Sequence, residues 1–333
     1  MSVQSEQARR GAVILAGGDG LRLTSLTRQI AGYCIPKQFC AVLGEETLLE
    51  QTWNRISLSV RPQHTVTVVT RSHEQFYGGV SGHDFAVQPL NRGTAPAILY
   101  GLFRLAAQMR VGPVALFPSD HYVSDDYRFM RHVDAAFATV ERQPDAIILL
   151  GITPEHPETE YGWIEPAESA HDDYLQPLAV ERFWEKPSTE AAHLLWRRGG
   201  LWNSFVVIAQ LRAWLALFLK ALPSLYVPFV ETRPMLGTVF EEKAIQALYA
   251  SIAMTNFSSE VLQAYPSDLA VLPVRGVDWN DLGEPARVLA TLEQIGFRPE
   301  WLRTGQSAQP ENQAHHGGRR EGYFGLTSHL GRK

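Results

Sequence analysis

Short apolar runs alternate along the chain with longer segments in which apolar residues recur every three or four positions. A short unbroken run is typical of a buried strand, and the longer pattern is typical of an amphipathic helix. The pattern predicts strands at Ala12–Ala16, Thr65–Thr70, Phe85–Val87, Val114–Phe117 and Ala146–Leu150. It predicts helices at Thr47–Leu58, Thr94–Ala107 and around Asp126–Val140. This alternation predicts an α/β fold with a mostly parallel sheet and helices on both faces.

After Gly151 the pattern changes to shorter β-like pieces separated by polar turns. These pieces are Gly162–Glu165, Ala179–Trp184 and Phe205–Ala209. Further helices are predicted at Arg212–Leu222, Glu241–Leu248 and Pro285–Ile295, and a returning strand at Leu269–Val274. We therefore expect one domain at 11–295, with an insertion at about 151–222 and a small C-terminal element at about 223–303. Residues 304–333 are rich in Gly, Gln, His and Arg, so a disordered tail is expected there.

The first predicted strand runs directly into a glycine-rich loop that also carries positive charge. It reads Leu15-Ala16-Gly17-Gly18-Asp19-Gly20-Leu21-Arg22-Leu23, and Pro36-Lys37-Gln38-Phe39 follows. Glycines let backbone N–H groups approach phosphate oxygens, while Arg22 and Lys37 add positive charge. The spacing lacks the third glycine of the dinucleotide fingerprint and the Gly-Lys-Ser/Thr of a Walker loop. The alternative is a plain strand-to-helix turn; we favour a different kind of triphosphate loop.

Two aspartates are candidate metal ligands. Asp120 follows the predicted strand Val114–Phe117, and the carboxyl ends of parallel strands are where open α/β sheets bind ligands. Asp281 lies in a turn that ends at Gly283, with Asp278 as a weaker substitute. Magnesium prefers carboxylate, phosphate and water oxygens, so Asp120 and Asp281 predict an Mg²⁺ site. Either aspartate alone could equally be a turn or helix-cap carboxylate.

These motifs resemble those of the nucleotide-sugar pyrophosphorylases, a family of sugar-phosphate nucleotidyltransferases. The family reads Gly-Gly-x-Gly-Thr-Arg-Leu followed by Pro-Lys, and its mannose-1-phosphate guanylyltransferase branch continues Pro-Lys-Gln-Phe as this chain does. Asp120 matches the family's Leu-Pro-Ala-Asp-His, and Asp281 matches its Trp-x-Asp-Val-Gly. The resemblance implies a Rossmann-like fold of the GT-A type. It also implies that Arg22 and Lys37 are catalytic and that nucleotide is bound by Ala16, Gly17, Gly18 and Gly20.

The sugar side of the resemblance rests on three short motifs. Glu185-Lys186-Pro187 matches the family's Glu-Lys-Pro, in which the carboxylate binds sugar hydroxyls and the lysine approaches the sugar phosphate. Tyr161-Gly162-Trp163 resembles Tyr-Gly-Tyr, and Leu201-Trp202-Asn203-Ser204 matches Leu-Trp-Asn-Ser. The resemblance implies sugar contacts from Gly162, Glu185 and Asn203 and a catalytic role for Lys186. A surface turn and an aromatic core strand are the alternatives for the single motifs.

The segment Gln88–Ala97 resembles the family's base-reading segment, which implies nucleotide contacts from Gln88 and Gly93. The guanylyl branch commonly has Glu where this chain has Gln88. A carboxylate can accept from both N1–H and the 2-amino group of guanine, whereas a Gln side chain offers one acceptor oxygen and an amide donor. Thymidylyl and uridylyl relatives also carry Gln there, so the base stays open. Leu21 and Phe205 are further departures, standing where the family has Thr and Gly.

The expected reaction joins GTP and mannose 1-phosphate to give GDP-mannose and pyrophosphate. A phosphomonoester has its second pKa near ~6, so near neutral pH the attacking oxygen is already deprotonated and no general base is needed. The enzyme supplies alignment and charge neutralisation. His121 is accordingly interpreted as a structural hydrogen-bonding residue. Other sugar phosphates, such as a heptose phosphate, and UTP or dTTP are alternatives within the class. A non-catalytic nucleotide-sugar sensor and a glycosyltransferase are alternatives outside it.

Composition limits the partners. The 333 residues carry a formal net charge of −5 and 45% hydrophobic residues, which is ordinary for a globular protein and gives no basic stripe for a nucleic acid. The two cysteines, Cys34 and Cys40, make no disulfide framework. The start of the chain lacks an apolar leader and no run could span a bilayer. We therefore expect a cytoplasmic enzyme with small-molecule substrates and no membrane or nucleic-acid partner; a homodimer stays open. Too few residues follow Ile295 for a second, isomerase domain.

Overall fold

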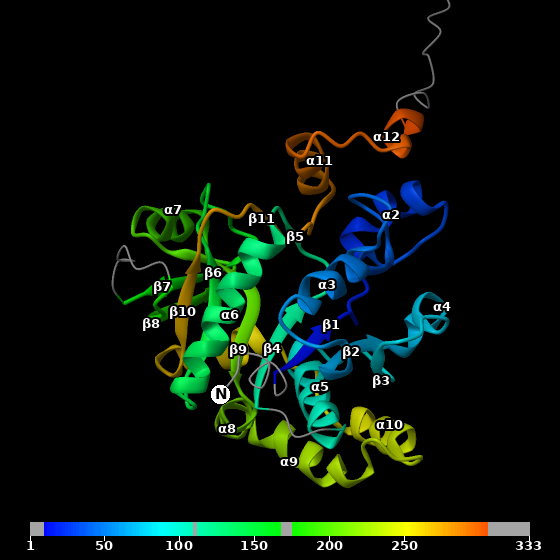
Figure 1. Cartoon of the computed structure of the whole chain (residues 1–333), viewed down its shortest axis with the longest axis vertical. Helices are drawn as coiled ribbons and strands as arrows, with labels where there is room; N and C mark the ends of the chain where they lie inside the picture. The colour runs from blue at the N-terminus through cyan, green and yellow to red at the C-terminus, as the bar shows by residue number, and fades with distance from the viewer. Residues whose placement is uncertain (1–9, 109–111, 168–174, 306–333) are drawn as a thin grey trace, which may run out of the picture. The chain divides into compact units, whose positions relative to one another are not determined.

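The computed structural model describes residues 10–108, 112–167 and 175–305. The chain divides into two compact units, residues 1–298 and 299–333; in the second, the described part is the helix α12 (Glu300–Gly305). The first unit contains a sheet of nine described strands in the order β3-β2-β1-β4-β9-β6-β10-β8-β7 (Figure 1). Their bounds are β1 (Gly11–Leu15), β2 (Thr65–Thr70), β3 (Asp84–Gln88), β4 (Pro113–Pro118), β6 (Ile147–Ile152), β7 (Gly162–Pro166), β8 (Leu178–Glu185), β9 (Leu201–Gln210) and β10 (Ala270–Val274).

Strand direction confirms the predicted α/β class. β3, β2, β1 and β4 are parallel neighbours, and β6 is parallel to β10. β9 runs antiparallel between β4 and β6, and β7 and β8 form an antiparallel pair at one edge. The helices of the unit are α2 (Thr24–Ala31), α3 (Leu48–Ser57), α4 (Glu74–Tyr77), α5 (Thr94–Gln108), α6 (Asp126–Arg142), α7 (Thr189–Arg197), α8 (Leu211–Ala221), α9 (Pro223–Thr232), α10 (Glu241–Ser251) and α11 (Pro285–Gln294).

Helices cover both faces of the sheet. On one face α5 packs so closely on β1 that a Cβ atom at Gly101 would lie 2.4 Å from Val13 Cγ1. α8, α9 and α10 share this apolar cluster, which includes Val114 and Leu116 of β4. The side chains of Ala115 and Phe117 point to the opposite face, because successive side chains alternate along a strand. α6 packs on β4, β6, β9 and β10, and none of its residues belongs to the first cluster, which places it on that opposite face (Figure 1).

Several elements differ from the sequence-based expectation. The prediction that strand structure begins at Phe205 was too short, because β9 starts at Leu201 and continues through Phe205, whose φ is +62°. The prediction missed α2, α7 and α9; α9 begins with Pro223 and contains Pro228, which read as helix breakers. It also missed a two-stranded sheet of β5 (Tyr122–Val123) and β11 (Trp279–Asn280). Strands of two residues carry no detectable periodicity.

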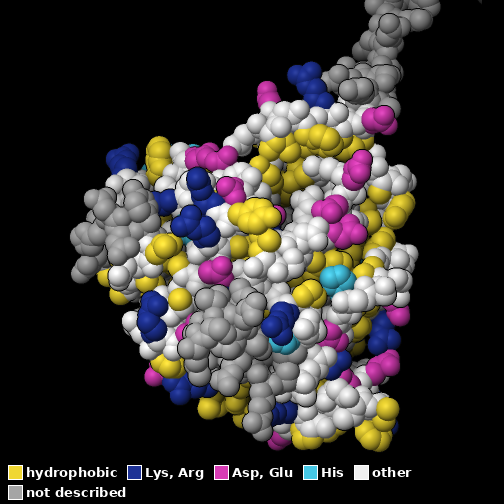
Figure 2. Space-filling view, viewed as in Figure 1, with side chains coloured by type: hydrophobic (Ala, Val, Ile, Leu, Met, Phe, Trp, Pro, Cys, Tyr) yellow, Lys and Arg dark blue, Asp and Glu magenta, His cyan; other side chains and the backbone are white. Residues whose placement is uncertain are grey.

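The predicted domain boundaries stay predictions. Within the described residues, α9 and α10 belong to the same apolar cluster as α5. Of the predicted tail, 304–305 close α12 and 306–333 lie outside the described residues. Among the described residues, no helix is both long and apolar enough to cross a bilayer. Figure 2 shows Lys and Arg side chains interspersed with Asp and Glu on the face in view, without a continuous basic stripe.

Candidate active site

The glycine loop follows β1 and is held by its carbonyl oxygens. The buried Gln38 side chain donates to the carbonyls of Ala16 and Gly18, at 2.9 and 2.8 Å, and the Thr70 hydroxyl donates to the carbonyl of Gly17 at 2.9 Å. These hydrogen bonds to the carbonyls hold the loop in place. The space beside Gly18 is open, because a Cβ there would meet no atom within 4 Å. Gly20 adopts φ +60°, a conformation that favours glycine. The predicted nucleotide-binding loop is thus ordered and open on one side.

Lys37 lies beside this loop, since a Cβ at Gly20 would be 3.3 Å from its backbone N, and its side chain contacts the segments of both predicted metal ligands. Its Nζ lies 3.3 Å from Oδ2 of Asp120 and donates to the backbone carbonyls of Asp281 and Leu282. Asp120 follows β4, which pairs with β1 in parallel, and Pro118 of β4 is in register with Leu15 of β1. The glycine loop after β1 and the Asp120 motif after β4 therefore leave the sheet at the same edge. Sequence reasoning placed Asp120 and Asp281 at one site, and the pairing of β5 with β11 is the element that brings their segments together.

The Asp281 carboxylate is mostly buried and surrounded by donors. Its Oδ1 accepts from the backbone N–H of Gly283 at 2.8 Å and from Arg287 Nη1 at 2.7 Å. Burial raises the pKa of this carboxyl, but basic neighbours outweigh burial and hold the pKa below its ordinary value. These neighbours are His121, which carries charge only in the acid range, and Lys37 and Arg287. Asp281 is therefore ionised at neutral pH.

His121 lies beside Asp120, with its Nε2 3.7 Å from Asp120 Oδ1 and its ring edge-on to Trp279. Burial lowers the pKa of His121 to about 4, so the ring is neutral at neutral pH. In the part of the chain that the structure describes, its buried Nδ1 has no hydrogen-bond partner. At 3.7 Å the contact with Asp120 is too long for a hydrogen bond, so the geometry does not support the expected hydrogen-bonding role, and the ring packs against Trp279.

Arg22 and Lys186, the other two predicted catalytic cations, meet at one carboxylate oxygen. Arg22 Nη1 lies 3.3 Å from Oε2 of Glu160, and Lys186 Nζ lies 3.2 Å from the same atom. Glu284, directly before α11, lies 3.7 Å from Arg22 through its Oε1. Lys186 directly follows β8 and has φ +49°, a conformation unusual for a residue other than glycine. All four side chains are about half exposed, unlike Lys37.

The three predicted sugar-binding residues lie together. A Cβ atom at Gly162 would be 3.2 Å from Oε2 of Glu185 and 3.3 Å from Cβ of Asn203. Strand pairing explains this, because Gly162 is level with Glu185 and the neighbouring Trp163 is level with Trp202. Burial raises the pKa of Glu185, which also accepts from the Ser258 hydroxyl. The three motifs thus form one polar cluster at the ends of β7 and β8.

The two predicted base-binding residues pack against the region around α10, Gln88 buried and Gly93 partly exposed. Tyr249 of α10 donates its hydroxyl to Gln88 Oε1 at 3.0 Å, and a Cβ at Gly17 would meet Gln88 Nε2 at 2.7 Å. Gln88 therefore presents its amide nitrogen to the glycine loop. Gly93 has φ +89°, and a Cβ there would lie 2.4 Å from the carbonyl oxygen of Thr255. Only glycine fits this backbone approach.

The two departures from the family pattern have different structural consequences. Phe205 keeps the positive φ that a glycine would supply, and Oδ1 of Asn203 accepts its backbone N–H at 3.1 Å. Its ring packs edge-on against Phe257, so the substitution places an aromatic ring beside the sugar cluster without changing the backbone course. Leu21 is 78% exposed, so it brings an apolar side chain to the surface of the loop.

Sequence reasoning missed four residues that organise this region. Gln38 stands inside the Pro-Lys-Gln-Phe motif and Glu160 directly precedes Tyr161-Gly162, so their positions next to motifs were a usable signal. Arg287 contacts Asp281, and at 3.3 Å also Glu158, from a helix beyond the last motif. Tyr249 contacts Gln88 across 161 positions. Nothing local in the sequence marks Arg287 or Tyr249.

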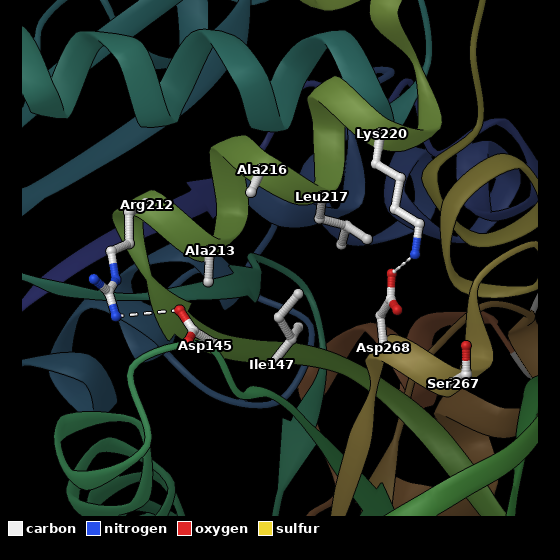
Figure 3. Close-up of a pocket in the computed structure, with 9 residues that line it drawn as sticks. All are labelled: Asp145, Ile147, Arg212, Ala213, Ala216, Leu217, Lys220, Ser267 and Asp268. Atoms are coloured by element: carbon white, nitrogen blue, oxygen red, sulfur yellow. Dashed lines mark hydrogen bonds and ion pairs between the residues drawn. The ribbon is translucent and has the colours of Figure 1, made fainter.

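A pocket of about 670 Å³ lies elsewhere, between α8, the start of β6 and the turn before β10 (Figure 3). Its charged side chains pair with one another, Arg212 with Asp145 at 3.1 Å and Lys220 with Asp268. It contains none of the motif residues. Because Ile147 is the first residue of β6, the pocket is at the end of that strand opposite to the carboxyl-end motifs. It is therefore not the candidate active site.

A comparison with family models matches residues 11–295 to the nucleotidyl transferase family. The chain belongs to this family. It is 28% identical to the xanthan biosynthesis protein XanB of Xanthomonas campestris pv. campestris over 302 residues, covering 85% of this chain and 60% of that protein. It is 29% identical to mannose-1-phosphate guanylyltransferase 2 of Escherichia coli O157:H7 over 300 residues, covering 82% of this chain and 58% of that protein. The chain thus spans about 60% of the length of these curated relatives.

A solved structure confirms the fold of the nucleotidyl transferase domain. A Thermus thermophilus protein described as mannose-1-phosphate geranyltransferase aligns with a TM-score of 0.72 and 28% identity, covering 87% of this chain and 80% of that one. A UDP-glucose pyrophosphorylase of Acinetobacter baumannii aligns at 14% identity with a TM-score of 0.54, covering 90% of this chain and 98% of that one, and supports the fold alone. The predicted Rossmann-like GT-A architecture is confirmed, and the matched family is that of the nucleotidyl transferases.

Proposed function

We propose that this nucleotidyltransferase joins a nucleoside triphosphate to a sugar 1-phosphate, and that its substrates are GTP and mannose 1-phosphate. The observation that carries the proposal is Lys37, which ties the glycine loop to the Asp120 and Asp281 segments at one edge of the sheet. The sugar cluster of Gly162, Glu185 and Asn203 lies where β7 begins, β8 ends and β9 begins. The named activity of the Escherichia coli relative supports the choice of substrates.

The proposed chemistry needs positioning and charge more than proton transfer. The sugar phosphate, largely dianionic near neutral pH, attacks the α-phosphorus through one of its oxygens, and the bond from that phosphorus to the pyrophosphate oxygen breaks. The backbone N–H of Ala16 already donates to the carbonyl of Val68 at 2.8 Å. In this proposal, backbone N–H groups from Gly17 to Gly20 therefore hold the triphosphate and Arg22 meets the departing pyrophosphate. Lys186 holds the sugar phosphate while Glu185 and Asn203 bind sugar hydroxyls. Lys37 positions the two aspartates.

Asp120 and Asp281 fit a magnesium ion. The described part of the chain has no group of three or more His, Cys, Asp and Glu side chains arranged for a metal. Two carboxylates suffice, however, because magnesium commonly completes its shell with substrate phosphates and water. The bonds from Gly283 and Arg287 both use Oδ1 of Asp281, so they leave its Oδ2 for another partner. When bound, magnesium would neutralise phosphate charge in the transition state.

A matrix of nucleotides and sugar 1-phosphates, assayed for pyrophosphate release with and without Mg²⁺, tests the proposal. We expect release that requires a sugar 1-phosphate and Mg²⁺ and is fastest with GTP and mannose 1-phosphate. Binding without turnover for every pair would instead indicate a nucleotide-sugar sensor. Full activity of both Asp120→Asn and Asp281→Asn at saturating Mg²⁺ would contradict the metal assignment.

One observation favours a second candidate, a uridylyl- or thymidylyltransferase. Because Tyr249 occupies Oε1 of Gln88, the side chain has its amide N–H groups left to offer a base. A carbonyl of uracil or thymine can accept from this amide. Guanine can accept through O6, but its N1–H and 2-amino group would then need acceptors other than Gln88. The same assay matrix separates the two candidates.

A further inference from the structure

Glu160 occupies the position at which Arg22 and Lys186 converge. A single oxygen, Oε2, lies 3.3 Å from Arg22 and 3.2 Å from Lys186. Under the proposed function, Arg22 faces the triphosphate and Lys186 faces the sugar phosphate. One carboxylate oxygen that contacts both cations therefore lies where phosphate oxygens of the two substrates would lie.

We propose that Glu160 is an internal competitor of the substrates: its carboxylate neutralises Arg22 and Lys186 in the free enzyme and is displaced when the two phosphates bind. The inference rests on the proposed function. It assigns Glu160 a role in setting the affinity for both substrates, because each must break one of its ion pairs.

The backbone around Glu160 explains why the carboxylate stays in reach. The backbone N–H of Glu160 donates to Oε1 of Glu158 at 2.9 Å, and Oε2 of Glu158 lies 3.3 Å from Arg287. Gly162, two residues on, begins β7 beside Glu185. Glu160 is thus held between an anchored turn and a strand, while its side chain is half exposed and able to rotate away.

The electrostatics fit displacement better than a permanent structural bridge. Hydrogen bonding and charge from Lys186, with a contribution from Arg22, lower the pKa of Glu160, so it is anionic at neutral pH. All three side chains are about half exposed, and exposed ion pairs contribute little and weaken with salt. A phosphate carries more charge than a carboxylate and can replace it at the same cations.

Substitution of Glu160 by Gln tests the proposal, because it removes the negative charge and keeps the shape. We expect the KM for both the triphosphate and the sugar 1-phosphate to fall about 1.5- to 5-fold, as the loss of exposed ion pairs predicts. The gain should shrink as salt is raised. Asp145→Asn is the matched control, since it removes one carboxylate from an exposed ion pair with Arg212 in the remote pocket, and we expect it to leave both KM values unchanged. Unchanged or raised KM values in Glu160→Gln would overturn the proposal and show that Glu160 positions the cations.

A binding measurement separates this proposal from the proposed function. Calorimetry with inorganic pyrophosphate needs no turnover, and we expect tighter binding to Glu160→Gln than to the wild type. In an Arg22→Ala, Lys186→Ala background the substitution should have no effect, because its partners are gone. Tighter pyrophosphate binding with no turnover of any substrate pair would retain the competition and reject the proposed function. Turnover with unchanged pyrophosphate affinity would reject the competition alone.

Discussion

Lys37 places its Nζ 3.3 Å from Oδ2 of Asp120 while donating to the main chain of Asp281 and Leu282. Its positive charge is therefore directed at protein groups, whereas the half-exposed Arg22 is within reach of solvent and ligand. The two cations of the glycine loop, which look equivalent in the sequence, have different surroundings. Lys37 holds the two aspartate segments together, and Arg22 is the more accessible anion-binding group.

Lys37→Met should lower both stability and activity. The change leaves two carbonyls and Asp120 without their buried donor, which costs about 1–3 kcal/mol in the free energy of unfolding. We expect turnover to fall roughly 100-fold or more, as for loss of a positioned charge at a reaction centre. Urea unfolding and pyrophosphate release measure the two effects. Lys220→Met is the control, because the half-exposed Lys220 pairs with Asp268 far from the motifs. A free energy of unfolding equal to that of the wild type in Lys37→Met would contradict the proposal that Lys37 holds the two aspartate segments together.

Asp281 should make stability depend on pH in the acid range. Its pKa is lowered in the folded protein, so its ionised form stabilises the fold above the ordinary carboxyl pKa of 3.8. That contribution is lost as pH falls through the lower folded pKa. The difference in unfolding free energy between the wild type and Asp281→Asn should therefore be largest at neutral pH and shrink below about pH 4. If the difference in unfolding free energy between the wild type and Asp281→Asn stays constant from pH 7 to pH 3, the pKa of Asp281 is not lowered by folding.

Gly17→Ala and Gly18→Ala should behave differently although they are neighbours. A Cβ at Gly17 would lie 2.7 Å from Gln88 Nε2 and 2.9 Å from Thr70 Oγ1, so these side chains must move. A Cβ at Gly18 meets nothing within 4 Å. We expect Gly17→Ala to lower the melting temperature by several degrees, from a cost of about 1–3 kcal/mol, and Gly18→Ala to leave it near the wild-type value. Equal melting temperatures for the two variants would argue against the packing around Gln88.

Tyr249→Phe should change base preference. Loss of the hydroxyl frees Oε1 of Gln88 to turn toward a base and costs roughly 1 kcal/mol of stability. The ratio of kcat/KM for GTP to that for UTP should rise, because an additional acceptor suits the donors of guanine. Tyr100→Phe, which removes a hydroxyl bonded to Glu241, is the matched control. An unchanged ratio in Tyr249→Phe would indicate that Gln88 does not determine the base preference.

The local sequence pattern was enough to predict the main strands and the candidate site residues that come directly after them. The glycine loop, Asp120 and the Glu185-Lys186 pair lie where the apolar runs stop. The strands β1, β2, β3, β4 and β6 and the helices α3, α5 and α6 followed from periodicity. Predicting that Asp120 and Asp281 lie at one site also required the order of the family motifs, because no local pattern indicates that Asp281 approaches Asp120. That approach depends on β5 and β11, which are only two residues long each.

Contacts between distant parts of the chain could not be predicted. Tyr249 reads as a core aromatic of α10, and only the folded structure directs its hydroxyl at Gln88. Arg287 reads as a helix surface residue but lies over the Tyr161 ring at 4.6 Å and bonds Asp281. Phe205 stands where the family has Gly, yet its φ is positive and its backbone N–H donates to Oδ1 of Asn203, which the residue type alone does not indicate. Tertiary packing decides each of these cases.

Isotope transfer tests the central claim most directly. If the sugar 1-phosphate attacks the α-phosphorus, its own oxygens stay in the product and none enters pyrophosphate. Mannose 1-phosphate carrying heavy oxygen in its non-bridging phosphate positions is incubated with GTP, Mg²⁺ and the enzyme, and both products are analysed by mass spectrometry. We predict that all of the label appears in GDP-mannose and none in pyrophosphate. Label in the pyrophosphate, or pyrophosphate release without a nucleotide sugar, would contradict the account.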